Sequence, residues 1–177
     1  MATYKQIIGL NVEAKSSDPT YAVEGQVWYN TTTGALKGAA ATSVGAWASG
    51  GNLNTPRRAL GSAGIQTAAL AFSGDNGSNP VTNVESYNGT SWTETTDVNT
   101  ARGFAGSSGK LYTAALLFGG TEPAYSAKTE NWNGSAWTEV ADLSTARNAI
   151  ASGLGTNTSA LATGGQGSSG QFSVTEC

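Results

Sequence analysis

Short apolar runs recur along the chain, and each is bounded by glycine or Asn-Gly turn signals. The run from Thr67 to Phe72 ends at Ser73-Gly74, which is typical of a buried β-strand followed by a tight turn. The next segment, Val84-Glu85-Ser86-Tyr87, has the period-two character of a half-buried strand. Asn88-Gly89 then predicts a two-residue hairpin turn into a last strand at Trp92. No window shows a helical period, so the sequence predicts an all-β fold made of four-stranded units.

This pattern repeats along the chain with a period of about 45 residues. The marker positions are a tryptophan, an arginine ten residues after it, and a glutamate in the third strand of each copy. They are Trp47, Trp92 and Trp137; Arg57, Arg102 and Arg147; and Glu85, Glu130 and Glu176. We therefore predict three repeats, at residues 47–91, 92–136 and 137–177.

The third repeat reaches Val174-Thr175-Glu176-Cys177 without the aromatic-Asn-Gly-x-x-Trp strand of the other copies. Propellers usually close with four to eight blades, and repeat arrays need capped ends. Three explanations are open. The polypeptide is longer than the sequence, neighbouring chains supply the missing strand, or the N-terminal segment with Trp28 and Trp47 returns to complete the unit. We favour the first, because the repeat stops within its motif.

The order of arginine, buried strand, Gly-Gly, acidic residue, aromatic residue, turn and tryptophan resembles the kelch repeat over residues 47–177. Gly119-Gly120 and Gly164-Gly165 match the kelch diglycine, whereas Ser73-Gly74 departs from it in the first residue. The short gap between the aromatic residue and the tryptophan is similar to kelch-like arrays in marine bacteriophage proteins. The resemblance implies kelch-like β-propeller blades, a scaffold that hosts many functions.

Residues 1–46 do not follow the repeat and form a separate unit. Val27-Trp28-Tyr29-Asn30, a threonine-rich turn and Leu36-Lys37 predict a β-hairpin. This stretch resembles a motif found near the N-terminus of phage fibre and other virion proteins, which implies an anchoring role. The small residues 38–46 are predicted to be a linker.

The composition narrows the chemistry further. The chain has no histidine, and its one cysteine is Cys177, so the usual histidine-dependent catalysts, zinc sites and intrachain disulfides are excluded. The net charge of −3 and the lack of a Lys/Arg run argue against nucleic-acid binding. No apolar run is long enough to span a bilayer, and the N-terminus lacks the apolar region of a secretory signal. We expect no cofactor, no metal and no membrane insertion.

The recurring polar and aromatic positions have a structural and a functional interpretation. Repetition favours the structural one, because catalytic residues are usually unique. We predict that each arginine pairs with a glutamate and that the three tryptophans pack between blades. The alternatives are paired carboxylates for acid–base catalysis, an arginine ring that binds a ligand, tryptophans that stack on sugars, and a Ca²⁺ site at Asp75–Asn79. The loops at 75–80 and 121–127 vary most between copies and are the predicted recognition surface.

These features predict a non-enzymatic structural protein of a bacteriophage virion, as a tail-fibre-like or capsid-surface appendage that attaches to the host. Its expected partners are other virion proteins, further copies of itself (as a trimer) and a host-surface glycan or protein. The alternative is a bacterial cell-surface or extracellular kelch-like adhesin that binds glycans. An oxidase or sialidase on a propeller scaffold is disfavoured, because copper ligands of the histidine type are absent and the arginines recur in every repeat.

Overall fold

The computed structural model describes residues 12–20, 25–39, 47–151 and 154–177. Every regular element in these ranges is a β-strand, which confirms the all-β class. The chain divides into two compact units, Met1–Ser49 and Gly50–Cys177. Of the predicted linker 38–46, Gly38 belongs to a strand (Ala35–Gly38), which corrects its start, and residues 40–46 lie outside the described residues.

The N-terminal unit is a three-stranded sheet of β1 (Glu13–Lys15), β2 (Val27–Asn30) and β3 (Ala35–Gly38). Strand β2 pairs antiparallel with β3, which confirms the predicted hairpin, and parallel with β1. Asn30 stabilises the turn, because its side-chain oxygen accepts hydrogen bonds from the backbone N–H groups of Thr32 and Thr33 at 3.1 and 3.0 Å.

Asp18 joins both strands of this hairpin. Its carboxylate accepts hydrogen bonds from Lys37 Nζ at 2.6 Å, Asn30 Nδ2 at 2.8 Å and Trp28 Nε1 at 3.1 Å. These donors, led by Lys37, lower the pKa of Asp18 to about 2 from its ordinary value of 3.8. The charged form of Asp18 is therefore the one that holds the hairpin together.

This pKa predicts acid sensitivity of the N-terminal unit. Because the folded-state pKa is lowered, the contribution of Asp18 to stability is fully present above about pH 4 and is lost as the pH falls towards 2. The indole N–H resonance of Trp28 in NMR spectra reports this loss. In Asp18→Asn the acid-dependent step should disappear, and the same step in both proteins would contradict the assignment.

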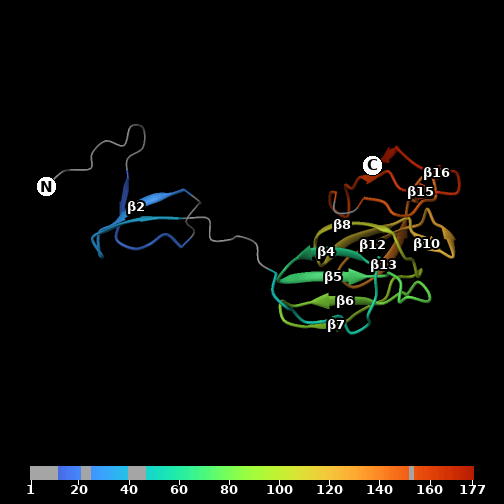
Figure 1. Cartoon of the computed structure of the whole chain (residues 1–177), viewed down its shortest axis with the longest axis horizontal. Coiled ribbons are helices and arrows are strands. Elements are labelled where there is room, and N and C mark those ends of the chain that lie inside the picture. The colour runs from blue at the N-terminus through green and yellow to red at the C-terminus, as the bar shows by residue number, and fades with distance from the viewer. Residues whose placement is uncertain (1–11, 21–24, 40–46, 152–153) are drawn as a thin grey trace. The chain divides into compact units, whose positions relative to one another are not determined.

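The second unit contains two four-stranded antiparallel sheets (Figure 1). The first has the order β4 (Gly61–Ile65), β5 (Ala68–Phe72), β6 (Val84–Tyr87) and β7 (Trp92–Glu94). The second repeats this order with β8 (Gly106–Leu111), β9 (Ala114–Phe118), β12 (Thr129–Trp132) and β13 (Trp137–Val140). Trp92 and Trp137 begin the last strand of the first and second sheet, respectively. Each sheet therefore ends just after a tryptophan, whereas each repeat predicted from the sequence begins at one.

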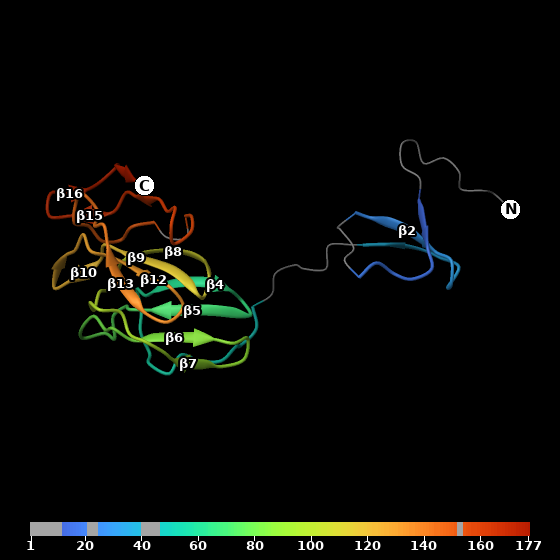
Figure 2. The same ribbon diagram turned by 180° about the vertical axis from the view of Figure 1, so that it is seen from behind.

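The third copy is shorter. Strand β14 (Ala162–Thr163) pairs with β17 (Thr175–Glu176), and Leu161 N donates to Leu154 O at 3.0 Å on the inner side. Small hairpins fill the loops after the second strands of the second and third copies. They are β10 (Thr121–Glu122) with β11 (Ala124–Tyr125), and β15 (Gln166–Gly167) with β16 (Gly170–Gln171). Figures 1 and 2 show this third copy beside the second sheet, on the side away from β6 and β7.

The two sheets pack face to face around one hydrophobic core. Leu70, Phe72 and Val84 of the first sheet meet Trp132 and Trp137 of the second, and all five side chains are buried. The Phe72 and Trp137 rings lie 5.0 Å apart between centroids. The inner strands β4 and β8 also contact each other, since Ser62 N donates to Ser107 Oγ and Ser107 Oγ donates to Ser62 O.

The first residue of each inner strand must be small. A Cβ atom added to Gly61 would collide with the Phe72 ring, and one added to Gly106 would collide with the Phe118 ring. We expect Gly61→Ala to lower the free energy of unfolding by about 1–3 kcal/mol, because the Phe72 ring is packed against Trp137 and cannot move without disturbing the core. Gly50→Ala is the control, since its nearest neighbour is 3.6 Å away, and urea denaturation measures both. Equal stability of the two variants would contradict the packing argument.

Candidate functional site

Arg57 and Glu85 form a buried tie in the first sheet. Arg57 Nη1 lies 2.5 Å from Glu85 Oε1, and neither side chain is exposed to solvent. The backbone N–H groups of Asn54 and Thr55 also donate to this carboxylate, at 2.7 and 3.3 Å. Burial raises the pKa of Glu85, but the two N–H groups and Arg57 together lower it below its ordinary value. The tie therefore fixes the segment before the inner strand to the third strand.

The second sheet repeats this arrangement with Arg102 and Glu130. Arg102 Nη2 lies 2.7 Å from Glu130 Oε1, and Asn99 N and Thr100 N donate to the same carboxylate at 2.8 and 3.2 Å. Arg102 Nη1 donates to the carbonyl oxygen of Lys128 at 2.5 Å. Burial lowers the pKa of Arg102, and Glu130 opposes that change. Glu130 therefore offsets part of the cost of burying the charged guanidinium.

The third repeat has the same arginine–glutamate pair, but its glutamate is partly exposed to solvent. Arg147 pairs with Glu176, and Ser144 N donates to Glu176 Oε2 at 2.6 Å. The arginine side chain is fully buried, but the glutamate side chain is 23% exposed, whereas Glu85 and Glu130 are sealed. All three predicted arginine–glutamate pairs are present, and the last one is incompletely covered.

The geometry of these ties suits a scaffold better than a reactive site. The carboxylates are occupied by backbone donors and guanidinium groups, and the three arginine side chains are fully buried rather than arranged around an open pocket. Within the described ranges, no group of three or more His, Cys, Asp or Glu side chains is placed to hold a metal ion. The ties therefore offer neither an accessible base nor an arginine ring that a ligand could reach.

The three tryptophans differ in environment. Trp137 is buried against Phe72, and Trp92 is half-buried with its ring centroid 4.9 Å from that of Tyr87. Trp47 is fully exposed, at 104% of its reference area, and lies outside any strand. The prediction that the tryptophans pack between repeat units fits Trp137, but it is wrong for Trp47 and is not met by Trp92, whose ring partner is in its own sheet. Trp137 is buried because the first sheet presents Phe72 to it, and spacing along the chain cannot ensure such a neighbour.

The two loops predicted to recognise a partner occupy equivalent places, each between the second and third strands of a sheet. In 75–80, Asp75 pairs with Arg58 and accepts a hydrogen bond from Gly77 N at 2.7 Å. Asn76 Oδ1 accepts from Ser78 N and Asn79 N, both at 3.0 Å. These oxygens are used within the loop, which weakens the Ca²⁺ interpretation. The 121–127 loop contains the β10–β11 hairpin instead.

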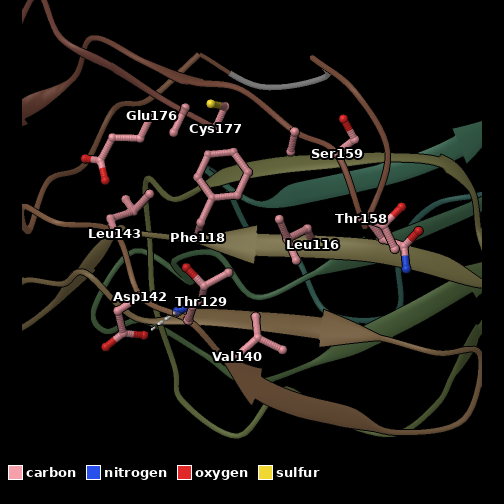
Figure 3. A pocket seen from close by; sticks show the side chains of 14 residues that line it. Leu116, Phe118, Thr129, Val140, Asp142, Leu143, Thr158, Ser159, Glu176 and Cys177 are labelled. Atoms are coloured by element: carbon pink, nitrogen blue, oxygen red, sulfur yellow. Dashed lines mark hydrogen bonds between the residues drawn. The ribbon is translucent and has the colours of Figure 1, made fainter.

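A cavity of about 540 Å³ lies between the second sheet and the third copy. Figure 3 shows Leu116 and Phe118 of β9 facing it, with Val140 of β13 on one side and Cys177 on another. We call this cavity the Phe118 groove. Sequence reasoning did not identify it, because no repeated motif marks the residues that line it.

Comparisons with known proteins establish the fold alone. No protein-family model matches the chain, and no curated protein does. Among solved structures, that of YjhT is similar, with a TM-score of 0.58 and 13% sequence identity. The match covers 84% of this chain and 47% of YjhT, so the chain spans about half the length of that protein. The described part of the chain contains no helix able to cross a membrane.

Proposed function

We propose that the repeats are kelch-like β-propeller blades and that the protein is a structural component of a bacteriophage virion. In this proposal it is a tail-fibre-like or capsid-surface appendage, with the N-terminal unit as anchor and the repeats presented to the host. The two stacked four-stranded sheets and the fold likeness to YjhT support a propeller-type array. The kelch-like and phage-fibre motifs of the sequence support the viral role.

One observation carries the structural interpretation: the same buried arginine–glutamate tie occurs in each repeat. Catalytic groups are accessible and placed at one site, whereas these groups recur in every repeat and, apart from the partly exposed Glu176, are sealed from solvent. Each arginine–glutamate pair attaches the segment that precedes the first strand of a repeat to the third strand of the same repeat. This use of charge suits a rigid scaffold that binds and assembles, and it supports a non-enzymatic role.

The recognition surface in this proposal is made by the loops 75–80 and 121–127. They differ in length and structure while the sheets beneath them repeat, as expected of binding loops on a rigid scaffold. Their polar residues would contact a host-surface glycan or protein. Other virion proteins are the proposed partners of the N-terminal unit, and homo-oligomerisation, as a trimer, remains part of the proposal.

Mass spectrometry and immunogold labelling of purified phage particles test the viral role. We expect the protein to co-purify with intact particles through a density gradient and antibodies against residues 50–177 to label their surface. Absence of the protein from particles, with its recovery from the bacterial cell envelope instead, would contradict the proposal.

The half-buried aromatic pair supports the second candidate, a bacterial cell-surface glycan-binding module. Tyr87 and Trp92 stack at 4.9 Å on the outer face of the first sheet, and aromatic faces of this kind bind sugar rings. A glycan array probed with the wild-type protein and Trp92→Ala tests this role. Sugar binding that Trp92→Ala abolishes would support it, and unchanged binding would exclude this pair as the sugar site.

A further inference from the structure

We propose that Asn88 and Asn133 are sites of deamidation in the folded protein, and that Asp75 protects Asn76 from the same reaction. These three asparagines are the ones that a glycine follows in the sequence, and all three are exposed to water. Glycine after asparagine favours deamidation, because no side chain hinders the backbone nitrogen that attacks. The modification needs only the turn and water, so it does not depend on the proposed viral role.

The reaction joins the glycine nitrogen to the side-chain carbon of the asparagine before it. Hydroxide takes the proton of the glycine N–H, and the nitrogen lone pair attacks Cγ, which places negative charge on Oδ1. The Cγ–Nδ2 bond then breaks, and Nδ2 leaves as ammonia after taking a proton from water. Water opens the resulting succinimide ring. Breaking the new N–Cγ bond gives aspartate, and breaking the original peptide bond gives isoaspartate.

The three turns hold the asparagine side-chain oxygen in the same way. In each turn, Oδ1 accepts hydrogen bonds from the backbone N–H groups two and three residues later, at 2.9–3.0 Å. Fixed N–H donors on an oxygen that gains negative charge stabilise the transition state. All three turns therefore favour attack at Cγ, and this contact does not distinguish them.

The attacking nitrogen does distinguish the turns. Gly77 N donates its hydrogen to Asp75 Oδ1 at 2.7 Å, and Arg58 Nε lies 3.3 Å from the same oxygen. Among the described residues, the N–H groups of Gly89 and Gly134 donate to no other group. Deprotonation of Gly77 would break a hydrogen bond to a charged group and place a second negative charge beside the carboxylate. Asp75 therefore slows the reaction in its own turn.

The reactive and the protected asparagines lie at opposite ends of the strands. Asn88 follows β6 and Asn133 follows β12, in the turns that lead to the last strand of each sheet. Asn76 lies in the loop 75–80, between β5 and β6. Each conversion adds a negative charge to an outer turn, and isoaspartate also lengthens the backbone there. The loop 75–80 keeps its neutral amide, a consequence for recognition that rests on the proposed function.

Peptide mapping by mass spectrometry measures the conversion of each asparagine in the full 177-residue chain, kept in warm, mildly alkaline buffer. In the folded protein we expect Asn88 and Asn133 to react roughly tenfold or more faster than Asn76, the effect of one hydrogen bond to a charged group. In guanidinium chloride the three should react at similar rates, because the fold no longer separates them. Labelling by isoaspartyl methyltransferase should mark the converted peptides, since the ring opens to isoaspartate as well.

The variant Asp75→Ala tests the protection itself. We expect it to raise the rate at Asn76 roughly tenfold or more, towards that of Asn88. Asp97→Ala is the matched control, because the carboxylate of Asp97 accepts a hydrogen bond from Thr82 Oγ1 rather than from a turn glycine. Equal rates at the three asparagines of the folded wild type would overturn the proposal, and this comparison needs no variant to fold. An unchanged rate at Asn76 in folded Asp75→Ala would overturn it as well.

Discussion

Arg102→Ala is expected to lower the free energy of unfolding by about 3–5 kcal/mol, the usual effect of breaking a fully buried ion pair. The substitution leaves Glu130 charged and sealed from water, and it removes the donor to the Lys128 carbonyl oxygen. Urea denaturation followed by tryptophan fluorescence measures the change. Arg58→Ala is the matched control: this arginine also pairs with a carboxylate, that of Asp75, but its side chain is 69% exposed. We expect a loss within about 1 kcal/mol there.

A double variant separates the cost of a stranded charge from a general loss of packing. Arg102→Met with Glu130→Leu removes both charges and keeps apolar volume, and we expect it to be more stable than Arg102→Ala. Replacing a buried pair by apolar residues is often neutral or stabilising. If Arg102→Ala cost no more than Arg58→Ala, the tie would not hold the sheet together, and the structural interpretation of the repeated charges would fail.

Trp137→Ala is expected to cost about 3–5 kcal/mol, as large-to-small changes of buried aromatic residues do. Its ring fills the space between the sheets against Phe72 and lies 5.3 Å from the Trp132 ring. Trp92→Ala should cost less, because that ring is only half-buried. Trp47→Ala should change the stability of the isolated chain by no more than about 0.5 kcal/mol, because the side chain is fully exposed.

These three variants form a graded series at one repeat position, measured by the same denaturation experiment. The order of the losses should follow burial: Trp137 first, Trp92 second and Trp47 last. Equal losses at all three positions would mean that the tryptophans have equivalent environments, which contradicts the exposure of Trp47 in the structure.

The repeat made the local elements and the charge pairing predictable. The apolar runs ending at glycine, the Asn-Gly turns and the tryptophan strands occur where the pattern indicated them. Arg102 and Glu130 were expected to pair because their positions recur together. When an arginine and a glutamate recur together at fixed positions, they are good candidates for an ion pair, since a favourable contact in one repeat is copied into the next.

The sequence could not show which neighbour covers each repeated position. Trp47 keeps the spacing of Trp137 but not its facing phenylalanine. Likewise, the left-handed backbones at Ala59, Phe104 and Ala149, with φ of 50°, 56° and 50°, follow no glycine signal. They follow from contacts between repeats, because Phe104 N donates to Ala59 O at 3.0 Å and Ala149 N donates to Phe104 O at 2.8 Å. Such conformations persist when surrounding structure fixes them.

Cryo-electron microscopy of the native assembly tests the central claim most directly. The account predicts repeated four-stranded sheets at the surface of a virus particle. A soluble, monomeric closed ring that is absent from particles and carries a ligand in its central pocket would contradict the structural-protein account and favour a binding protein or an enzyme.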